Sequence, residues 1–164
     1  MSFNWREHLE DAMRSTCYCC LSTKDAEGIW ANPVYFAYDA GFNIYFISMP
    51  ASRHMKAIGS SAPIAVAIYA TDQPAGGDVK GIQLSGFARV LDDDEVAAAA
   101  EVYYGRAGAA EAAGGTADAS KHLGDSAVWK FVKVIPEEIY YFDTRFFDEE
   151  KEGRQLVPKE IYRD

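Results

Sequence analysis

Residues 80–91 read KGIQLSGFARVL, and their side chains alternate in character along the chain. The alternation places Ile82 and Leu84 on one face and Gln83 and Ser85 on the other, which predicts a β-strand with two different faces. Gly86 interrupts this pattern. A glycine inside a strand indicates a bulge or the close approach of another backbone. We therefore expect a long strand that bends near its middle.

Six further segments on either side of this strand have strand-like composition and are separated by turn residues. The first three form a predicted meander, and the apolar run 64–69 is expected to be buried on both faces. Pro136 is expected to divide the last stretch into two strands. About seven strands in hairpin order favour a mainly β antiparallel barrel with edge helices over a doubly wound sheet. The six segments are residues 16–23, 29–38, 42–48, 64–69, 128–135 and 138–144.

Three short helices are predicted at the edges of this barrel. Asn4 and Glu7 form a capping box at the start of a helix over residues 5–14. Residues 51–58 suit a helix that ends near Gly59, and three aspartates open a third helix over residues 95–106. The Ala- and Gly-rich segment 107–120 is expected to be mobile, and the charged tail 148–164 is expected to pack loosely. We predict one domain over residues 1–164, with its core at about 16–143.

Composition restricts the functional classes. The chain has 164 residues and a formal net charge of −9, and it lacks the basic surface that duplex DNA or an anionic membrane requires. No signal peptide is visible at the N-terminus, and no apolar run reaches the roughly 18 residues of a membrane span. We therefore expect a cytoplasmic protein with a small-molecule ligand, and no nucleic acid or membrane as partner.

The segment Ser52-Arg53-His54-Met55-Lys56 is the best candidate for an anion site. It follows a strand and opens a helix, where unpaired backbone N–H groups favour an anion. Arg53 and Lys56 are three residues apart and share a helical face. Their guanidinium and ammonium groups suit a phosphate. An ordinary capped surface helix with solvated basic side chains remains the alternative.

Two strand segments offer further binding candidates. Pro33 lies inside the segment Asn32-Pro33-Val34-Tyr35, and a proline there belongs at a barrel edge or bulge, where free backbone groups can face a planar ligand. Gln83 could present its amide to a ring or a phosphate. A plain barrel edge and a solvent-facing polar stripe are the respective alternatives.

In their chain order, these segments resemble the pyridoxamine 5'-phosphate oxidase-related FMN-binding split-barrel family. The resemblance extends from about Thr16 to Asp143, and each motif is individually weak while the ordered set is more specific. It implies a split barrel that forms a homodimer, with FMN held between the subunits. The resemblance rests on Asn32–Asp39, the strand leading to Ser52-Arg53-His54, Gly81–Gly86, Trp129 and Pro136–Asp143.

The resemblance also implies roles for individual residues. Ser52, Arg53 and Lys56 would hold the FMN phosphate, residues 32–35 would lie along the isoalloxazine ring, and Gln83 would reach the flavin from the next wall. His54 stands where the oxidase has a second basic phosphate ligand. Trp129 would contribute to the partner's site, although a core tryptophan is equally plausible.

The C-terminal segment lacks the Arg-Leu-His-Asp-Arg type of run that binds pyridoxal phosphate in the oxidase, so we do not expect vitamin B6 oxidation. We expect instead an FMN-dependent oxidoreductase acting on another small molecule, with no catalytic residue identifiable from the sequence. The alternatives are a protein that binds flavin, deazaflavin or haem without turnover, and a structural dimer without a cofactor. Colour and reactivity with NAD(P)H would distinguish these three.

The remaining reactive side chains have simpler interpretations. Cys17, Cys19 and Cys20 lack the second pair of ligands that a structural zinc site needs, so we expect buried, reduced thiols and no metal. His8 and His122 are expected on the surface.

Overall fold

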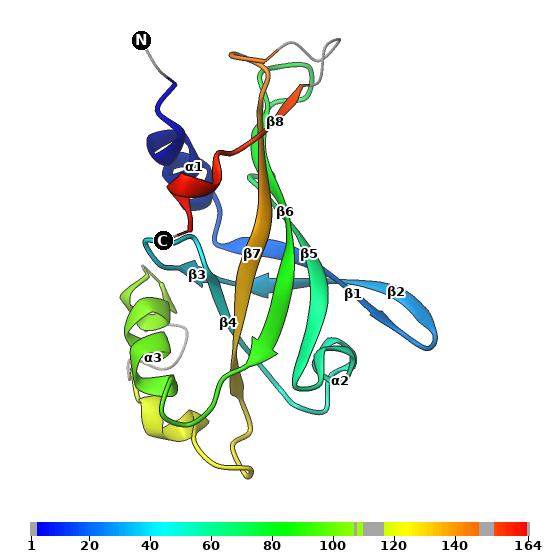
Figure 1. Cartoon of the computed structure of the whole chain (residues 1–164), viewed down its shortest axis with the longest axis vertical. Helices are drawn as coiled ribbons and strands as arrows, with labels where there is room; N and C mark the ends of the chain where they lie inside the picture. The colour runs from blue at the N-terminus through cyan, green and yellow to red at the C-terminus, as the bar shows by residue number, and fades with distance from the viewer. Residues whose placement is uncertain (1–2, 107, 110–116, 148–152, 164) are drawn as a thin grey trace.

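The computed structural model describes residues 3–106, 108–109, 117–147 and 153–163, and eight strands in this part form one antiparallel sheet (Figure 1). The strand order is β2-β1-β5-β6-β7-β4-β3, and β8 pairs with β7. The mainly β prediction is confirmed. The elements are α1 (Trp5–Arg14), β1 (Tyr18–Asp25), β2 (Gly28–Tyr35), β3 (Ala37–Tyr38), β4 (Ile44–Ser48), α2 (Arg53–Ile58), β5 (Ser61–Tyr69), β6 (Lys80–Val90), α3 (Val96–Gly105), the 3-10 helix η1 (Ala119–His122), β7 (Lys130–Asp143), β8 (Arg154–Leu156) and the 3-10 helix η3 (Lys159–Ile161).

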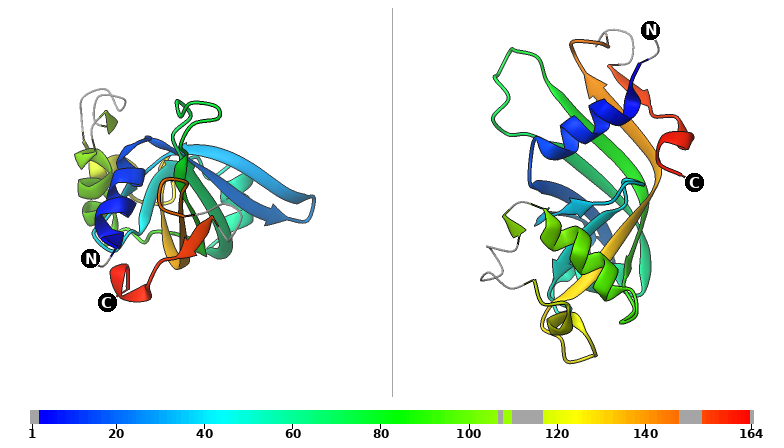
Figure 2. Two further views of the ribbon diagram at one scale, coloured as in Figure 1. Left: turned by 90° about the horizontal axis from the view of Figure 1, so that it is seen from above. Right: turned by 90° about the vertical axis from the view of Figure 1, so that its left-hand side faces the viewer.

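The sheet curls into a half-barrel because one stretch of chain serves both of its ends (Figure 2, left). The single strand expected over residues 29–38 is divided at Phe36 into β2, which pairs with β1, and β3, which pairs with β4. The predicted meander is therefore present, but β3 and β4 share only two residue pairs, and the long partner of β4 is β7. This arrangement leaves β2 as an edge strand, as expected from Pro33.

The two longest strands, β6 and β7, are bent at a common point. Their register shifts between Ser85 and Gly86, so the predicted bulge is confirmed. Gly86 is required there because a Cβ atom would lie 2.1 Å from the carbonyl oxygen of Ile135. The predicted division of β7 at Pro136 is wrong. Pro136 lies opposite Gly86 within the irregularity, where the missing N–H removes no regular ladder bond.

The strand β5 is buried on one face only, so the prediction of burial on both faces is wrong. Ile64, Val66 and Ile68 point into the core, with 5%, 3% and 0% exposure, whereas Ala65 and Ala67 face outward. The apolar run arises because the outward positions carry small alanines. This burial alternation extends over β6, where Gln83, Ser85 and Phe87 face outward, and it leaves this sheet face exposed within the described chain.

All three helices form where the sequence predicts them. Asn4 caps α1, which buries Leu9, Ala12 and Met13, and Gly59 ends α2 with a φ of 55°. The helices α1 and α3 lie on the same side of the sheet (Figure 2, right). The side chains of α3 and those of β4 and β7 form a second apolar cluster, separate from the main core inside the half-barrel.

The prediction of a loosely packed tail is wrong for its described residues. Within residues 153–163, β8 extends the sheet, and Val157 and Tyr162 enter the main core with 0% and 6% exposure. Residues 148–152 lie outside the described part. The segment 107–120, expected to be mobile, falls largely outside it as well, at residue 107 and residues 110–116.

Candidate functional site

A cavity of about 570 Å³ opens between the edge strand β2, the end of β4, the helix α3 and the segment leading into β7. Its volume lies within the roughly 300–1,000 Å³ that is usual for small-molecule and cofactor sites. It contains five of the residues predicted from the sequence, brought together from two distant segments. The lining residues are Asn32, Pro33, Val34, Tyr35, Ile47, Ser48, Tyr103, Tyr104, Ala109, Lys121, His122 and Trp129.

The aromatic end of this cavity follows from the packing of α3 against the sheet. Tyr35 and Tyr103 meet edge to face, with ring centroids 5.5 Å apart, and Tyr103 packs in the same way on Phe131. Trp129 is 44% exposed on the rim, so the alternative of a core tryptophan is wrong. Aromatic side chains placed in this way suit a planar, largely apolar ligand.

At one wall of the cavity, Ser48 contacts the side chains of Ser52 and His54, which do not themselves line the cavity. Ser48 lines the cavity, and its Oγ lies 2.7 Å from Nε2 of His54 and 3.4 Å from Oγ of Ser52. His54 is buried, and burial lowers its pKa, so the ring is neutral near pH 7. His54 therefore supplies no positive charge for an anion and acts instead as a hydrogen-bonding partner that holds both hydroxyls.

Arg53, at the start of α2, points toward the β1–β2 hairpin. Its Nε and Nη2 donate to the carboxylate of Asp25 at 2.7 and 3.0 Å, and the guanidinium lies 4.7 Å from the centre of the Trp30 ring. The hydrogen bonds from Arg53 are the main reason that the pKa of Asp25 falls to about 2. Lys56 is exposed on the next turn. Neither basic side chain lines the cavity, and Arg53 is already engaged by a carboxylate.

Gln83 does not lie in this cavity. It projects from the outer face of β6, where its Oε1 accepts a hydrogen bond from Nη1 of Arg154 at 2.9 Å. The register places Pro33, Cys20, Ala67 and Gln83 in one row across four neighbouring strands. Three strand spacings separate the ends of this row by about 14 Å. Gln83 therefore cannot reach the cavity of its own chain.

Seven residues of the cavity wall were missed by the sequence reasoning: Ile47, Ser48, Tyr103, Tyr104, Ala109, Lys121 and His122. Tyr104 and His122 are buried, with 9% and 3% exposure, so the prediction that His122 lies on the surface is wrong. The hydroxyl of Tyr104 lies 2.8 Å from Nε2 of His122. No sequence signal joins them, because 18 residues separate them, and only the packing of η1 against α3 brings them together.

The predicted burial of the cysteines is confirmed for Cys19 only, because Cys17 and Cys20 are partly exposed. All three are free thiols, and burial raises the pKa of Cys19 to about 12, which makes it unreactive. Among the described residues, no cluster of three or more His, Cys, Asp or Glu side chains is suitable for a metal ion. No helix in the described part has the length and apolar character to cross a membrane.

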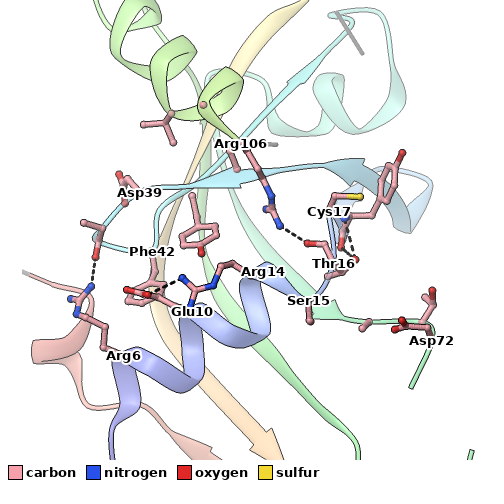
Figure 3. Close-up of a pocket in the computed structure, with 18 residues that line it drawn as sticks. Arg6, Glu10, Arg14, Ser15, Thr16, Cys17, Asp39, Phe42, Asp72 and Arg106 are labelled. Atoms are coloured by element: carbon pink, nitrogen blue, oxygen red, sulfur yellow. Dashed lines mark hydrogen bonds and ion pairs between the residues drawn. The ribbon is translucent and has the colours of Figure 1, made fainter. Parts of the chain in front are cut away.

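A larger cavity, of about 1,050 Å³, lies between α1, β3 and the end of α3 (Figure 3). Its arginines are engaged in structural bonds. Arg106 donates to the backbone carbonyls of Phe36 and Met13, both at 2.7 Å, and Arg14 pairs with Glu10 at 3.1 Å. None of the residues predicted to bind a ligand lines it. The smaller cavity is therefore the candidate site.

The curled antiparallel sheet defines a split-barrel protein, with an aromatic cavity beside the edge strand β2. Residues 6–142 match the family model described as Pyridoxamine 5'-phosphate oxidase. The chain belongs to this family. A comparison with curated proteins found no match.

Solved structures show the same fold at low sequence identity. A heme binding protein from Mycobacterium smegmatis aligns with 99% of this chain and 61% of its own, at 17% identity and a TM-score of 0.72. A pyridoxamine 5'-phosphate oxidase-related, FMN binding protein from Nostoc punctiforme PCC 73102 aligns over 94% and 89%, at 14% identity and a TM-score of 0.63. An FAD binding protein from Mycobacterium smegmatis aligns over 86% and 95%, at 14% identity and a TM-score of 0.61.

Two solved structures with this fold are considerably longer than the chain. The chain spans 61% of the heme binding protein and 58% of a protein of unknown function from Agrobacterium tumefaciens str. C58. The comparisons together establish a fold on which related proteins bind FMN, FAD or haem.

Proposed function

We propose that the chain binds FMN in the cavity between β2 and α3 and acts as a flavin-dependent oxidoreductase on a small molecule. The observation that carries this proposal is the convergence of five predicted residues on one aromatic cavity, in which the Oγ of Ser48 lies 3.4 Å from that of Ser52, the residue before Arg53. The five residues are Asn32, Pro33, Val34, Tyr35 and Trp129. A flavin would supply hydride and electron transfer, and the protein would supply position and electrostatics.

The residues of the cavity fit the two ends of FMN. The isoalloxazine ring would lie against residues 32–35 and Trp129, where aromatic surface is available. The phosphate would lie beyond Ser48, where the hydroxyl of Ser52 makes no helix-capping bond among the described residues. To reach the phosphate, Arg53 would exchange its bond with Asp25 for an equivalent charge-assisted bond.

We further propose that the protein works as a homodimer. Gln83, which the family resemblance relates to the flavin, lies on the outer sheet face, about 14 Å across the row from Pro33. If a second copy packed on this face, Gln83 of one copy would reach the cavity of the other copy. Tyr69 and Phe87 are 48% and 44% exposed on the same two strands, which supports burial of this face in an assembly.

Titration of the purified protein with FMN, followed by flavin fluorescence, tests the proposal. Arg53→Ala should raise the Kd roughly tenfold or more, as expected for the loss of a charge-assisted hydrogen bond. Asp25→Asn should lower the Kd, because it frees the guanidinium and removes a repelling carboxylate. Equal affinities for both variants and the wild type would refute the phosphate assignment. Bleaching of the bound flavin by NAD(P)H would then separate an oxidoreductase from a storage protein.

Haem is the second candidate ligand. The observation that favours it is the alignment of the Mycobacterium smegmatis heme binding protein with 99% of this chain. The same purified protein should then show an intense Soret band with haem and no quenching of FMN fluorescence. Titration with a deazaflavin in parallel would test the remaining alternative on this fold.

A further inference from the structure

The two nitrogens of His122 have different partners, and these partners fix the position of its hydrogen. Nδ1 lies 2.9 Å from the backbone carbonyl oxygen of Trp129, which can only accept. Nδ1 of the neutral ring therefore carries the hydrogen, and Nε2 is the acceptor. The hydroxyl of Tyr104, 2.8 Å away, must then donate to Nε2. In this state the cavity meets only the lone pairs of the Tyr104 oxygen.

Protonation of His122 would reverse this arrangement without moving a heavy atom. The imidazolium has hydrogens on both nitrogens, so Nε2–H would donate to the oxygen of Tyr104. The hydroxyl hydrogen of Tyr104 would turn away from the ring and toward the cavity, which both residues line. The wall would change from a hydrogen-bond acceptor to a donor, at the cost of one proton taken from solvent.

We propose that Tyr104 and His122 form a proton-dependent switch that offers a hydrogen bond to an electron-rich or anionic atom of the molecule bound in this cavity. This inference rests on the proposed function, and it assigns to the site two residues that neither the sequence nor the family resemblance indicated. Tyr104 is the group that touches the bound molecule. His122 is a positioning residue that acts through it, and the Trp129 carbonyl fixes the tautomer.

The surroundings of the pair are compatible with both states. Burial raises the pKa of Tyr104, so the phenol remains a neutral donor and acceptor. The elements packed around His122 bring the phenol of Tyr104 from α3 and the ring of Phe131 from β7, whose centroid lies 4.7 Å away. The charged neighbours are Asp118, before η1, and Lys121, within η1.

The switch itself can be tested without any ligand. In protein labelled with ¹⁵N and ¹³C, neutral His122 should carry its hydrogen on Nδ1, and the Cζ shift of Tyr104 should follow the titration of His122. In His122→Gln, which keeps an amide near the hydroxyl but cannot be protonated, the Tyr104 shift should be independent of pH. A neutral ring protonated on Nε2, or a Tyr104 signal that ignores His122, would overturn the proposal.

The action of the Tyr104–His122 switch on a bound molecule is tested with FMN. Reduction adds negative charge to the flavin ring, so the donor state of Tyr104 should be favoured and one further proton taken up. The midpoint potential of bound FMN should then depend on pH more steeply in the wild type than in His122→Gln. The largest possible difference between the two slopes corresponds to one further proton per reduction. This proton changes the equilibrium constant of reduction tenfold per pH unit, which is about 30 mV for a two-electron couple.

Two variants complete this design. Tyr104→Phe should reduce the pH dependence of the midpoint potential as His122→Gln does, because it removes the hydroxyl between the imidazole and the cavity. His8→Gln, on α1 and outside the lining of this cavity, should behave as the wild type. Unchanged slopes in both cavity variants would overturn the inference. Failure to bind FMN would instead refute the proposed function, while the NMR titration would still decide whether the switch exists.

Discussion

Replacing Gly86 by alanine should destabilise the protein strongly, because the added methyl group has no space. Its Cβ would lie 2.1 Å from the carbonyl oxygen of Ile135 and 2.9 Å from Cα of Pro136. Both atoms belong to the backbone of β7, which pairs with β6 from one end to the other. A flexible side chain would yield to such a contact, but two paired strands can do so only by separating at the bulge.

The size of the effect follows from this geometry. Overpacking of a well-packed interior typically costs 1–3 kcal/mol, and a rigid backbone neighbour places this substitution at the upper end, at about 3 kcal/mol. For a chain of this length, such a loss lowers the Tm by about 6–12 °C. The strain would also reach the cavity, because Phe131, on the same half of β7, packs on His122 and Tyr103.

Equilibrium denaturation in urea, together with thermal unfolding, measures this prediction. Gly105→Ala is the matched control, because no atom lies within 4 Å of its added Cβ and its backbone has no left-handed strain. This control should be neutral or stabilising by about 0.4–1 kcal/mol. If Gly86→Ala were as stable as Gly105→Ala, the close approach of the two strands would not be a constraint, and our account of the bulge would be refuted.

Three further predictions concern pH, the tail and the outer sheet face. The Arg89–Glu95 bond, with Nη1 and Oε2 2.6 Å apart, lowers the pKa of Glu95 from 4.5 to about 2, so its stabilisation is complete above pH 4.5 and is lost as pH falls toward 2. Glu95→Gln should therefore lower the Tm at pH 7, and this deficit should vanish near pH 2 in a pH series of melting curves. Val157→Ala should cost about 2 kcal/mol in urea denaturation, whereas Leu156→Ala, at a 47% exposed position, should cost little, and equal losses would contradict the packing of the tail. Gln83→Ala should weaken FMN binding at concentrations where ultracentrifugation shows a dimer, and wild-type affinity there would exclude Gln83 from the site.

Much of the fold could be predicted from local patterns. The capping pair Asn4 and Glu7, the glycine that ends α2 and the alternation along β6 each act over a few residues, so their consequences are visible in the sequence. Errors arose where a distant partner changes the meaning of a residue. Pro136 alone predicts the end of a strand, but it lies opposite Gly86 at the bulge, where the strand continues. The charged tail appears loose until Val157 is seen to fill the core.

The candidate site shows the same division. The sequence by itself determined a β-rich chain and the segment Asn32–Tyr35 that lines the cavity, because strand periodicity and an edge proline are local properties. Only the tertiary structure decided that Arg53 is held by Asp25 and that Tyr104 meets His122. It also separated Gln83, on β6, from the cavity segment on β2 by the two strands β1 and β5. The physical reason is that hydrogen bonds, burial and charge pairing act across space, between residues whose separation along the chain carries no periodic signal.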